Sequence, residues 1–196
     1  GLDASALAVL EHLWSVERGI LDLLRDLLVT PTHMESRVTA FLNTWAYEQY
    51  WVAQSLAAVL EANGQEPREP DDTALGGALR TWDERFSPTI QAFRTNLLGE
   101  EIVAAHMSTG WLGTAVIDLA YARLAAIEGR LAPMCDRVRG IKARHLAFYS
   151  DDARSRLTGH AGARRLARRA VAAWEWPGTR YAGRAPVRPV LVTLFA

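Results

Sequence analysis

The sequence predicts an all-α protein, built as a four-helix bundle with one long crossover and an extra C-terminal helix. Apolar residues make up 49% of the 196 residues, which suits one domain with a substantial core. Four long stretches carry apolar residues at helical spacing, and no strand-like alternation stands out. A stretch rich in Pro, Asp and Gly separates the second from the third, so we expect two pairs of helices joined by a long connection.

The first pair of helices has recognisable ends. The first helix is expected over residues 3–28, because the Thr30-Pro31 dipeptide stops it. The second is expected to open at a capping box formed by Thr32 and Glu35 and to close at Asn63-Gly64.

The connection and the second pair follow. The connection is expected to include a short helical piece that starts at Ser87-Pro88. The third and fourth helices are expected over residues 100–128 and 132–157, and each is followed by a glycine. A shorter basic helix, about 161–174, comes next.

The chain is expected to form one domain over residues 1–178, with a tail over 179–196. The tail is rich in Arg and Pro and ends in a short apolar run that fixes no secondary structure. We expect it to pack on the domain or on a neighbouring subunit.

Composition excludes several classes of protein. The single cysteine, Cys135, leaves no internal disulfide and no cysteine-based zinc site. No uninterrupted apolar run approaches the ~20 residues that span a bilayer, and no signal-like segment opens the chain. The sequence therefore predicts a soluble, cytoplasmic protein that does not bind membranes.

Net charge is zero, but its distribution is uneven. Residues 1–129 contain 18 acidic and 8 basic side chains, whereas residues 130–196 contain 4 and 14. Acidic and basic helices that pack side by side would explain this. The alternative is an anionic partner at the basic end, such as an acidic carrier protein. Nucleic acid is not expected, because the basic segment lacks interleaved aromatic residues and any known binding motif.

Polar residues interrupt the core-facing stripe of each long helix near its middle. Helices of similar length that pack antiparallel bring their midpoints to one level, so these residues should share a buried layer. They are Glu17, Gln49, Thr114, Lys142 and His145, with Asp118 one turn beyond Thr114. Burial of such groups is unfavourable unless they pair with one another. The layer indicates either a polar cavity or a device that fixes helix register.

Two segments, 45–52 and 142–149, resemble a ferritin-like family of bacterial di-iron oxidases and desaturases. The segment 104–121 is similar to the metal-bearing helix between them, and Trp176-Pro177-Gly178 is similar to the end of a following helix. A single long crossover is also the connectivity of ferritin-like folds.

The resemblance implies where a di-iron centre would have its ligands. Members of the family use a Glu from each of two helices and a Glu-x-x-His pair from each of the others. The equivalent positions here are Glu17, Gln49 with Val52, Thr114, and Lys142 with His145. Only Glu17 and His145 keep a ligand of the expected type, so we expect no metal and no cofactor. The competing interpretation is a di-iron oxygenase in which Glu48, Asp118 and His106 serve as shifted ligands.

Lys142 is the only lysine, beside 21 arginines. A desolvated lysine can lose its proton near neutral pH and act as an acid, a base or a Schiff-base nucleophile. The alternative is a structural ammonium that replaces the charge of the metal and pairs with Glu17 or Asp118. His145 is a suitable second acid–base group.

The expected function is metal-independent acid–base catalysis by Lys142, His145, and Glu17 or Asp118. The reaction would be a cyclisation, isomerisation or elimination of a small apolar or aromatic molecule. The resemblance implies that this molecule is a biosynthetic intermediate. The residues expected to line the site are Gln49, Thr114, Trp45, Val52, Trp111, Tyr121 and Tyr149.

Aromatic residues near the layer would line any cavity there, although most are expected to be core. The set also includes Trp14, Tyr47 and Trp51. The alternative to an enzyme is a non-catalytic pseudo-enzyme that binds a ligand or a partner, and ferritin-like chains often form homodimers.

Overall fold

The computed structural model describes residues 1–19, 24, 27, 31–67, 101–177, 179 and 184–195, and these residues are all-helical, with no strand. The long helices are α1 (Ala4–Arg18), α3 (Ser36–Ala62), α5 (Glu101–Ile127) and α6 (Ala132–Leu157). The shorter elements are η1 (Pro31–Met34), η2 (Gly129–Leu131), α7 (Ala161–Ala172) and α9 (Arg184–Phe195). The all-α prediction is confirmed for this part of the chain.

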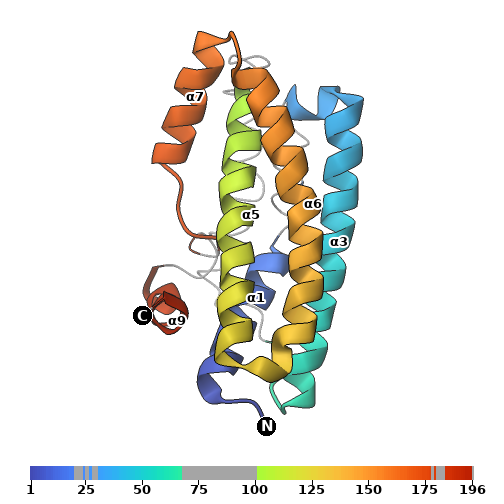
Figure 1. The fold of residues 1–196 in the computed structure, drawn as a ribbon, viewed down its shortest axis with the longest axis vertical. Coiled ribbons are helices and arrows are strands. Elements are labelled where there is room, and N and C mark those ends of the chain that lie inside the picture. The colour runs from blue at the N-terminus through green and yellow to red at the C-terminus, as the bar shows by residue number, and fades with distance from the viewer. Residues whose placement is uncertain are drawn as a thin grey trace, which may run out of the picture.

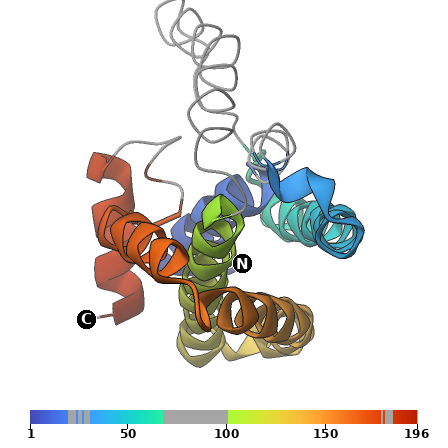
Figure 2. The ribbon, with the colours of Figure 1, turned by 90° about the horizontal axis from the view of Figure 1, so that it is seen from above.

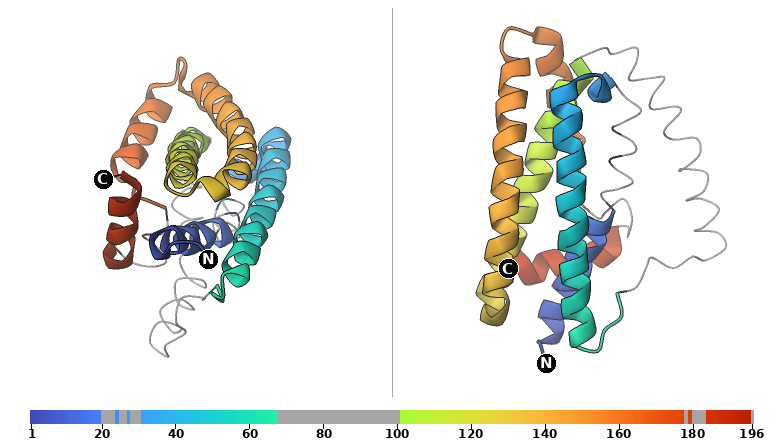
Figure 3. Two further views of the ribbon diagram at one scale, coloured as in Figure 1. Left: turned by 60° about the horizontal axis from the view of Figure 1, so that its bottom comes forward. Right: turned by 90° about the vertical axis from the view of Figure 1, so that its right-hand side faces the viewer.

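The long helices form a bundle (Figure 1). α1 packs antiparallel on α3, and α5 packs antiparallel on α6. α3 and α5 run in the same direction, so the chain between them joins opposite ends of the bundle. α7 lies along α5, and Figure 2 shows α7 and α9 on one side of α5 with α3 on the other. α5 therefore lies in the middle of the molecule, as the left view of Figure 3 shows.

Several predicted helix ends are confirmed. α3 ends before Asn63, and Gly64 adopts a φ of 77°, the left-handed conformation that closes helices. α6 spans the predicted residues, and Gly159 takes the same conformation at 79° after its end. α5 ends at Ile127, within one residue of the prediction, and it is helical from Glu101, where the description of the chain resumes.

The predicted capping box at the start of α3 was wrong. Residues 31–34 form the 3-10 helix η1, and Glu35 precedes α3 without a side-chain cap. Thr32 is buried instead, and its hydroxyl lies 2.8 Å from His106 Nδ1 on α5. Thr32 therefore contacts His106, far away in the sequence, and does not form the predicted capping box with Glu35.

The first helix is described in α1 as far as Arg18, and beyond Gly19 only Leu24 and Leu27 are described, both helical. The rest of the predicted helix, the piece at Ser87-Pro88 and Gly178 at the predicted domain boundary lie outside the described residues.

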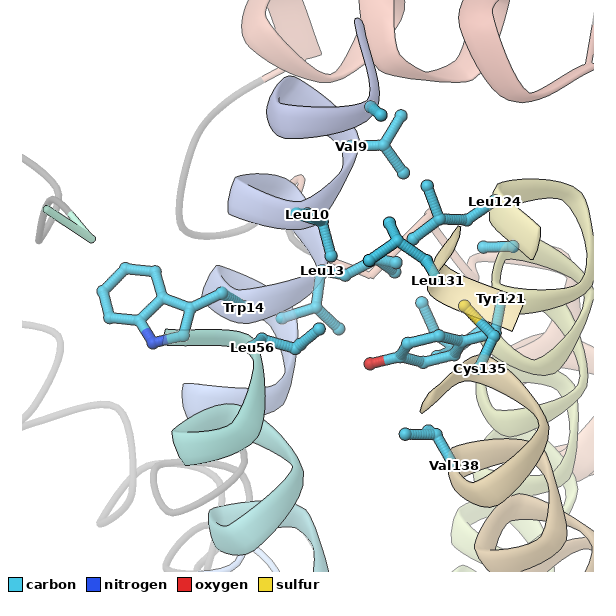
Figure 4. Close-up of a cluster of buried hydrophobic side chains, with 14 of the residues drawn as sticks. Val9, Leu10, Leu13, Trp14, Leu56, Tyr121, Leu124, Leu131, Cys135 and Val138 are labelled. Atoms are coloured by element: carbon cyan, nitrogen blue, oxygen red, sulfur yellow. The ribbon is translucent and has the colours of Figure 1, made fainter. Parts of the chain in front are cut away.

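Buried apolar side chains form two clusters. Figure 4 shows the first, in which α1, α3, α5 and α6 contribute residues such as Leu10, Leu56, Leu124 and Val138. The second joins α3, α5 and α6 and includes Leu42, Trp45, Met107 and Tyr149. Along α3 and α6, the polar residues Gln49 and Lys142 lie between members of the two clusters.

The tail contains a helix. α9 packs on α1 of the same chain, and Val187, Val190 and Leu194 are buried there. The division of the chain at residue 178 stays a prediction.

Among the described residues, one helix, α5, is long and apolar enough by length and composition to span a membrane. In this structure α5 packs against α6 and α7.

Candidate functional site

Lys142 lies inside the bundle, where its side chain is 1% exposed. Its Nζ lies 2.7 Å from Oε1 and 2.8 Å from Oε2 of Glu17 on α1. It also donates a hydrogen bond of 2.6 Å to Oε1 of Gln49 on α3. An ammonium carries three N–H donors, and two of them are used by the hydrogen bonds to Glu17 and Gln49. The structure thus brings together three of the polar residues predicted to share a layer.

Tyr121 on α5 completes this cluster. Its hydroxyl donates to Glu17 Oε1 over 3.1 Å, and its ring is fully buried. In Figure 4 the hydroxyl oxygen of Tyr121 points away from α5 into the interior. The sequence predicts Tyr121 in the lining of the site, but not its bond to Glu17. Burial raises the pKa of Tyr121, and the Glu17 carboxylate raises it further, so the phenol keeps its proton.

Burial lowers the pKa of Lys142, since desolvation penalises its charged form. The Glu17 carboxylate opposes this shift, and the charges of Asp118 and Glu48 add to that opposition. Because the carboxylate is in direct contact, the pair is best described as an ammonium with a carboxylate.

His145 follows Lys142 by one helical turn and bonds to Glu48 on α3. The distance from His145 Nε2 to Glu48 Oε2 is 2.6 Å, so an Nε2–H donates to the carboxylate. Burial lowers the pKa of His145 to about 4, and the charge of Lys142 contributes, while Glu48 opposes it. His145 is therefore neutral at neutral pH, with its proton on Nε2.

Glu48 lies at the edge of the interface between α3 and α6, with 21% of its side chain exposed. Burial raises the pKa of Glu48, but hydrogen bonds from Arg144 and His145 outweigh this effect and leave the pKa below its usual value. From the sequence, Glu48 is predicted only as a shifted metal ligand. The contact of Glu48 with Arg144 and His145 was not predicted, although an acidic residue beside Gln49 and a basic residue beside His145 indicate it.

Two buried polar atoms of this region have no hydrogen-bond partner: Trp45 Nε1 and His145 Nδ1. One is a donor and the other, in the tautomer given above, is an acceptor. Both side chains are almost completely buried, at 3% and 2% exposure. An unpartnered buried polar group is costly, so a polar ligand that bonded to either atom would relieve that cost.

The remaining predicted site residues take other positions. Asp118 forms an ion pair of 3.2 Å with Arg139 and makes no hydrogen bond to Lys142. Thr114 is buried on α5 but does not bond to Lys142. Val52 lies in the first apolar cluster, and Tyr149 packs 6.5 Å from the Trp45 ring.

Three aromatic residues expected near the layer lie on the surface instead. Trp111 on α5 is 43% exposed, and Tyr47 and Trp51 on α3 are 65% and 53% exposed. Tyr47 and Trp51 pack edge to face against each other, with ring centres 6.3 Å apart. They are exposed because their positions on α3 lie outside its core-facing stripe.

The residues present do not fit a di-iron centre. Oε2 of Glu17 accepts a hydrogen bond from Lys142 and Oε1 lies 2.7 Å from the same nitrogen, and an ammonium at that distance repels a metal cation. The proposed substitutes are dispersed, because Glu48 pairs with His145, Asp118 with Arg139 and His106 with Thr32. Within the described part of the chain, no three His, Cys, Asp or Glu residues group closely enough to hold a metal.

Comparisons with known proteins give no match: no family model, no curated protein and no solved structure is similar to this chain.

Proposed function

We propose that this chain is a ferritin-like protein in which a buried ion pair replaces the metal centre, and that it catalyses metal-independent acid–base chemistry. Its substrate would be a small apolar or aromatic biosynthetic intermediate, and the reaction a cyclisation, isomerisation or elimination. The bundle supports this proposal, because α3 and α5 run in the same direction and are joined across its length.

The observation that carries the proposal is the buried cluster of ionisable groups. Lys142, Glu17 and Tyr121 are all at most 1% exposed, and His145 lies one turn from Lys142 with an unpartnered Nδ1. Perturbed ionisable groups of this kind gather at active sites more often than in ordinary cores.

The cluster supplies both halves of a proton transfer. Nδ1 of His145 has a free lone pair that can take a proton from a carbon next to a carbonyl. The Lys142 ammonium can give a proton to the carbonyl oxygen, which yields the neutral enol. Glu17 and Gln49 hold that ammonium in place. Return of the His145 proton to another carbon, and of the enol proton to Lys142, completes an isomerisation.

A test uses 5-nitrobenzisoxazole, a small aromatic molecule whose ring opens when a base removes one carbon-bound proton. We expect wild-type protein to open it and His145→Phe, which loses Nδ1, to lose at least about 10²-fold in rate. Lys142→Arg should also lose rate, because the larger planar group does not fit the same three acceptors. His160→Phe, a change of an exposed histidine, is the matched control.

Two outcomes would contradict the proposal. Folded His145→Phe and Lys142→Arg proteins that match the wild-type rate would remove both residues from the mechanism. Near-stoichiometric iron or manganese in the purified wild-type protein would restore the di-iron oxygenase interpretation.

One observation favours a second candidate, a non-catalytic pseudo-enzyme that binds a ligand or a partner. Two N–H groups of Lys142 donate to Glu17 and Gln49 of the protein itself, so at most one is left for a substrate. Because Lys142 is the only lysine, protein labelled with ¹⁵N-lysine gives a single side-chain ammonium signal. A signal that stays unchanged when 5-nitrobenzisoxazole is added would favour this second candidate.

A further inference from the structure

A groove of about 470 Å³ lies between α5, α6 and α7. Its volume falls in the range of roughly 300–1,000 Å³ that small-molecule sites occupy. None of the residues that line it belongs to the Lys142 cluster. It is therefore a separate feature, built where the basic helix α7 packs beside α5 (Figure 1).

The groove is mainly apolar. Trp111 and Leu112 of α5, Leu157 of α6 and Val171 of α7 contribute to its walls. Trp111 and Val171 are 43% and 42% exposed, so two large apolar side chains are left open to solvent at one place. Exposed apolar surface that lines a concave site is typical of ligand-binding grooves.

The charged residue in the groove wall is Arg154 of α6, and none of the described residues that line the groove carries a carboxylate. Arg154 is exposed, and no described residue forms an ion pair with it. Other arginines of the bundle do have carboxylate partners: Arg37 with Asp152, Arg139 with Asp118, Arg144 with Glu48, and Arg156 with Glu35 and Asp152.

A second cation lies at the rim. Arg164 of α7 donates from Nη1 to the backbone oxygen of Leu157 over 2.9 Å, which fixes it beside a residue of the groove wall. Arg168, one turn further along α7, is exposed. The groove thus combines apolar walls with positive charge that the described residues do not neutralise.

We propose that this groove binds a small amphipathic anion, with its apolar body against Trp111 and Val171 and its acidic head group on Arg154. A guanidinium binds carboxylate and phosphate with similar planar hydrogen-bond geometry, so the shared chemistry is an oxyanion on an apolar chain. This site does not depend on catalysis at Lys142.

The test is isothermal titration of the full chain with decanoate, decyl phosphate and decanol. We expect at least one of the two anions to bind about tenfold or more tightly than decanol, because a charge-assisted hydrogen bond is lost in the alcohol. The tighter anion identifies the head group as carboxylate or phosphate.

Two variants locate the site. Arg154→Leu removes the cation, and Val171→Asp places a negative charge on an exposed position of the groove wall, so each should weaken anion binding about tenfold or more. Arg137→Leu, on the same helix at an exposed position outside the groove, should bind like wild type. Circular dichroism checks that all three proteins fold.

The proposal is overturned if decanol binds as tightly as both anions, or if neither anion binds at millimolar concentration. It is equally overturned if folded Arg154→Leu and Val171→Asp bind the anions as wild type does.

Discussion

Lys142 and Glu17 form an ion pair to which water has almost no access, since their side chains are 1% and 0% exposed. A buried pair of this kind is a poor source of stability, because desolvation of two charges offsets most of their attraction. Removal of one partner lowers the free energy of unfolding strongly, because the other charge then stays buried without compensation. The pair therefore makes the centre of the bundle sensitive to single substitutions.

Lys142→Met should lower the free energy of unfolding at neutral pH by about 3–5 kcal/mol, since it leaves the Glu17 carboxylate buried alone. The double variant Glu17→Gln/Lys142→Met should recover most of this loss, because it removes both charges and keeps an acceptor for the Tyr121 hydroxyl. Urea unfolding of the wild type, both single variants and the double variant measures the coupling between the two residues.

Asp136→Asn is the control for this cycle. Asp136 pairs with Arg139 over 4.0 Å and its side chain is 71% exposed, where an ion pair contributes little, so this variant should unfold almost as the wild type does. A double variant no more stable than Lys142→Met alone would show that the two charges do not compensate each other.

Two histidines with lowered pKa values, His145 and His106, make stability depend on pH. The pKa values of His145 and His106 are each lowered to about 4, mainly by burial, whereas an unfolded histidine titrates near 6.5. Between these values the unfolded chain binds more protons than the folded one, so stability falls as the pH falls.

From about pH 7 to about pH 5, we expect each histidine to reduce the free energy of unfolding by about 2 kcal/mol. His145→Asn and His106→Asn should each show a smaller loss over this interval in urea unfolding. Above pH 7 the variants and the wild type should change in parallel, since both histidines are neutral there. Equal losses in all three proteins below pH 7 would contradict this assignment.

At the scale of the helix, α5 carries two glycines with opposite surroundings. A Cβ on Gly110 would lie 2.5 Å from Cε1 of Tyr149, whereas a Cβ on Gly113 would meet nothing closer than Nε1 of Trp174 at 3.9 Å. Gly110 therefore allows α5 and α6 to approach each other closely at the Tyr149 ring. At Gly113 no neighbouring side chain comes close enough to require a glycine.

Gly110→Ala should destabilise the protein by about 1–3 kcal/mol, because the added methyl overpacks the contact with Tyr149. Gly113→Ala, three residues away on the same helix, should stabilise it by about 0.5–1 kcal/mol, since alanine is the better helix former. Thermal unfolding of the two variants measures both effects. Stabilisation of both variants would mean that helix propensity outweighs the contact with Tyr149 at Gly110.

The ends of several helices could be predicted because local chemistry fixes them. Gly64 and Gly159 take positive φ angles that other residues rarely adopt, and the sequence marks them directly. The start of α3 was predicted wrongly for the opposite reason. Thr32 bonds to His106, a residue 74 positions away, and no local pattern reports a partner at that distance.

At the scale of the whole molecule, the last described helix, α9, packs against the first, α1. It packs on α1, and Val190 and Leu194 belong to the same apolar cluster as Leu10 and Leu13 of α1. The packing of the tail therefore contributes to the same core that surrounds the Lys142 cluster.

Val190→Asp should lower the free energy of unfolding by at least about 2 kcal/mol, because it places an unpaired charge in this cluster. Val192→Asp is the matched control, since Val192 is 56% exposed and its substitution should change stability by about 0.5 kcal/mol at most. Denaturation at several protein concentrations completes the test. A loss seen only at high concentration would place α9 on a neighbouring subunit instead.

The sequence by itself determined that the chain forms long helices and which side of each of them is buried, but it did not predict the helix α9 in the tail. The period of 3.6 residues carries this information, and it is local to each helix. Thus the five polar residues predicted to share a buried layer are all buried: Glu17, Gln49, Thr114, Lys142 and His145.

Only the tertiary structure decided which polar atoms meet. Asp118 shares a helix with Thr114 but pairs with Arg139, and Glu48 reaches His145 from the edge of the α3–α6 interface. The physical reason is that a hydrogen bond depends on distances of a few tenths of an ångström between separate helices. Helical periodicity orients each side chain about its own axis, but it does not fix how far one helix stands from the next.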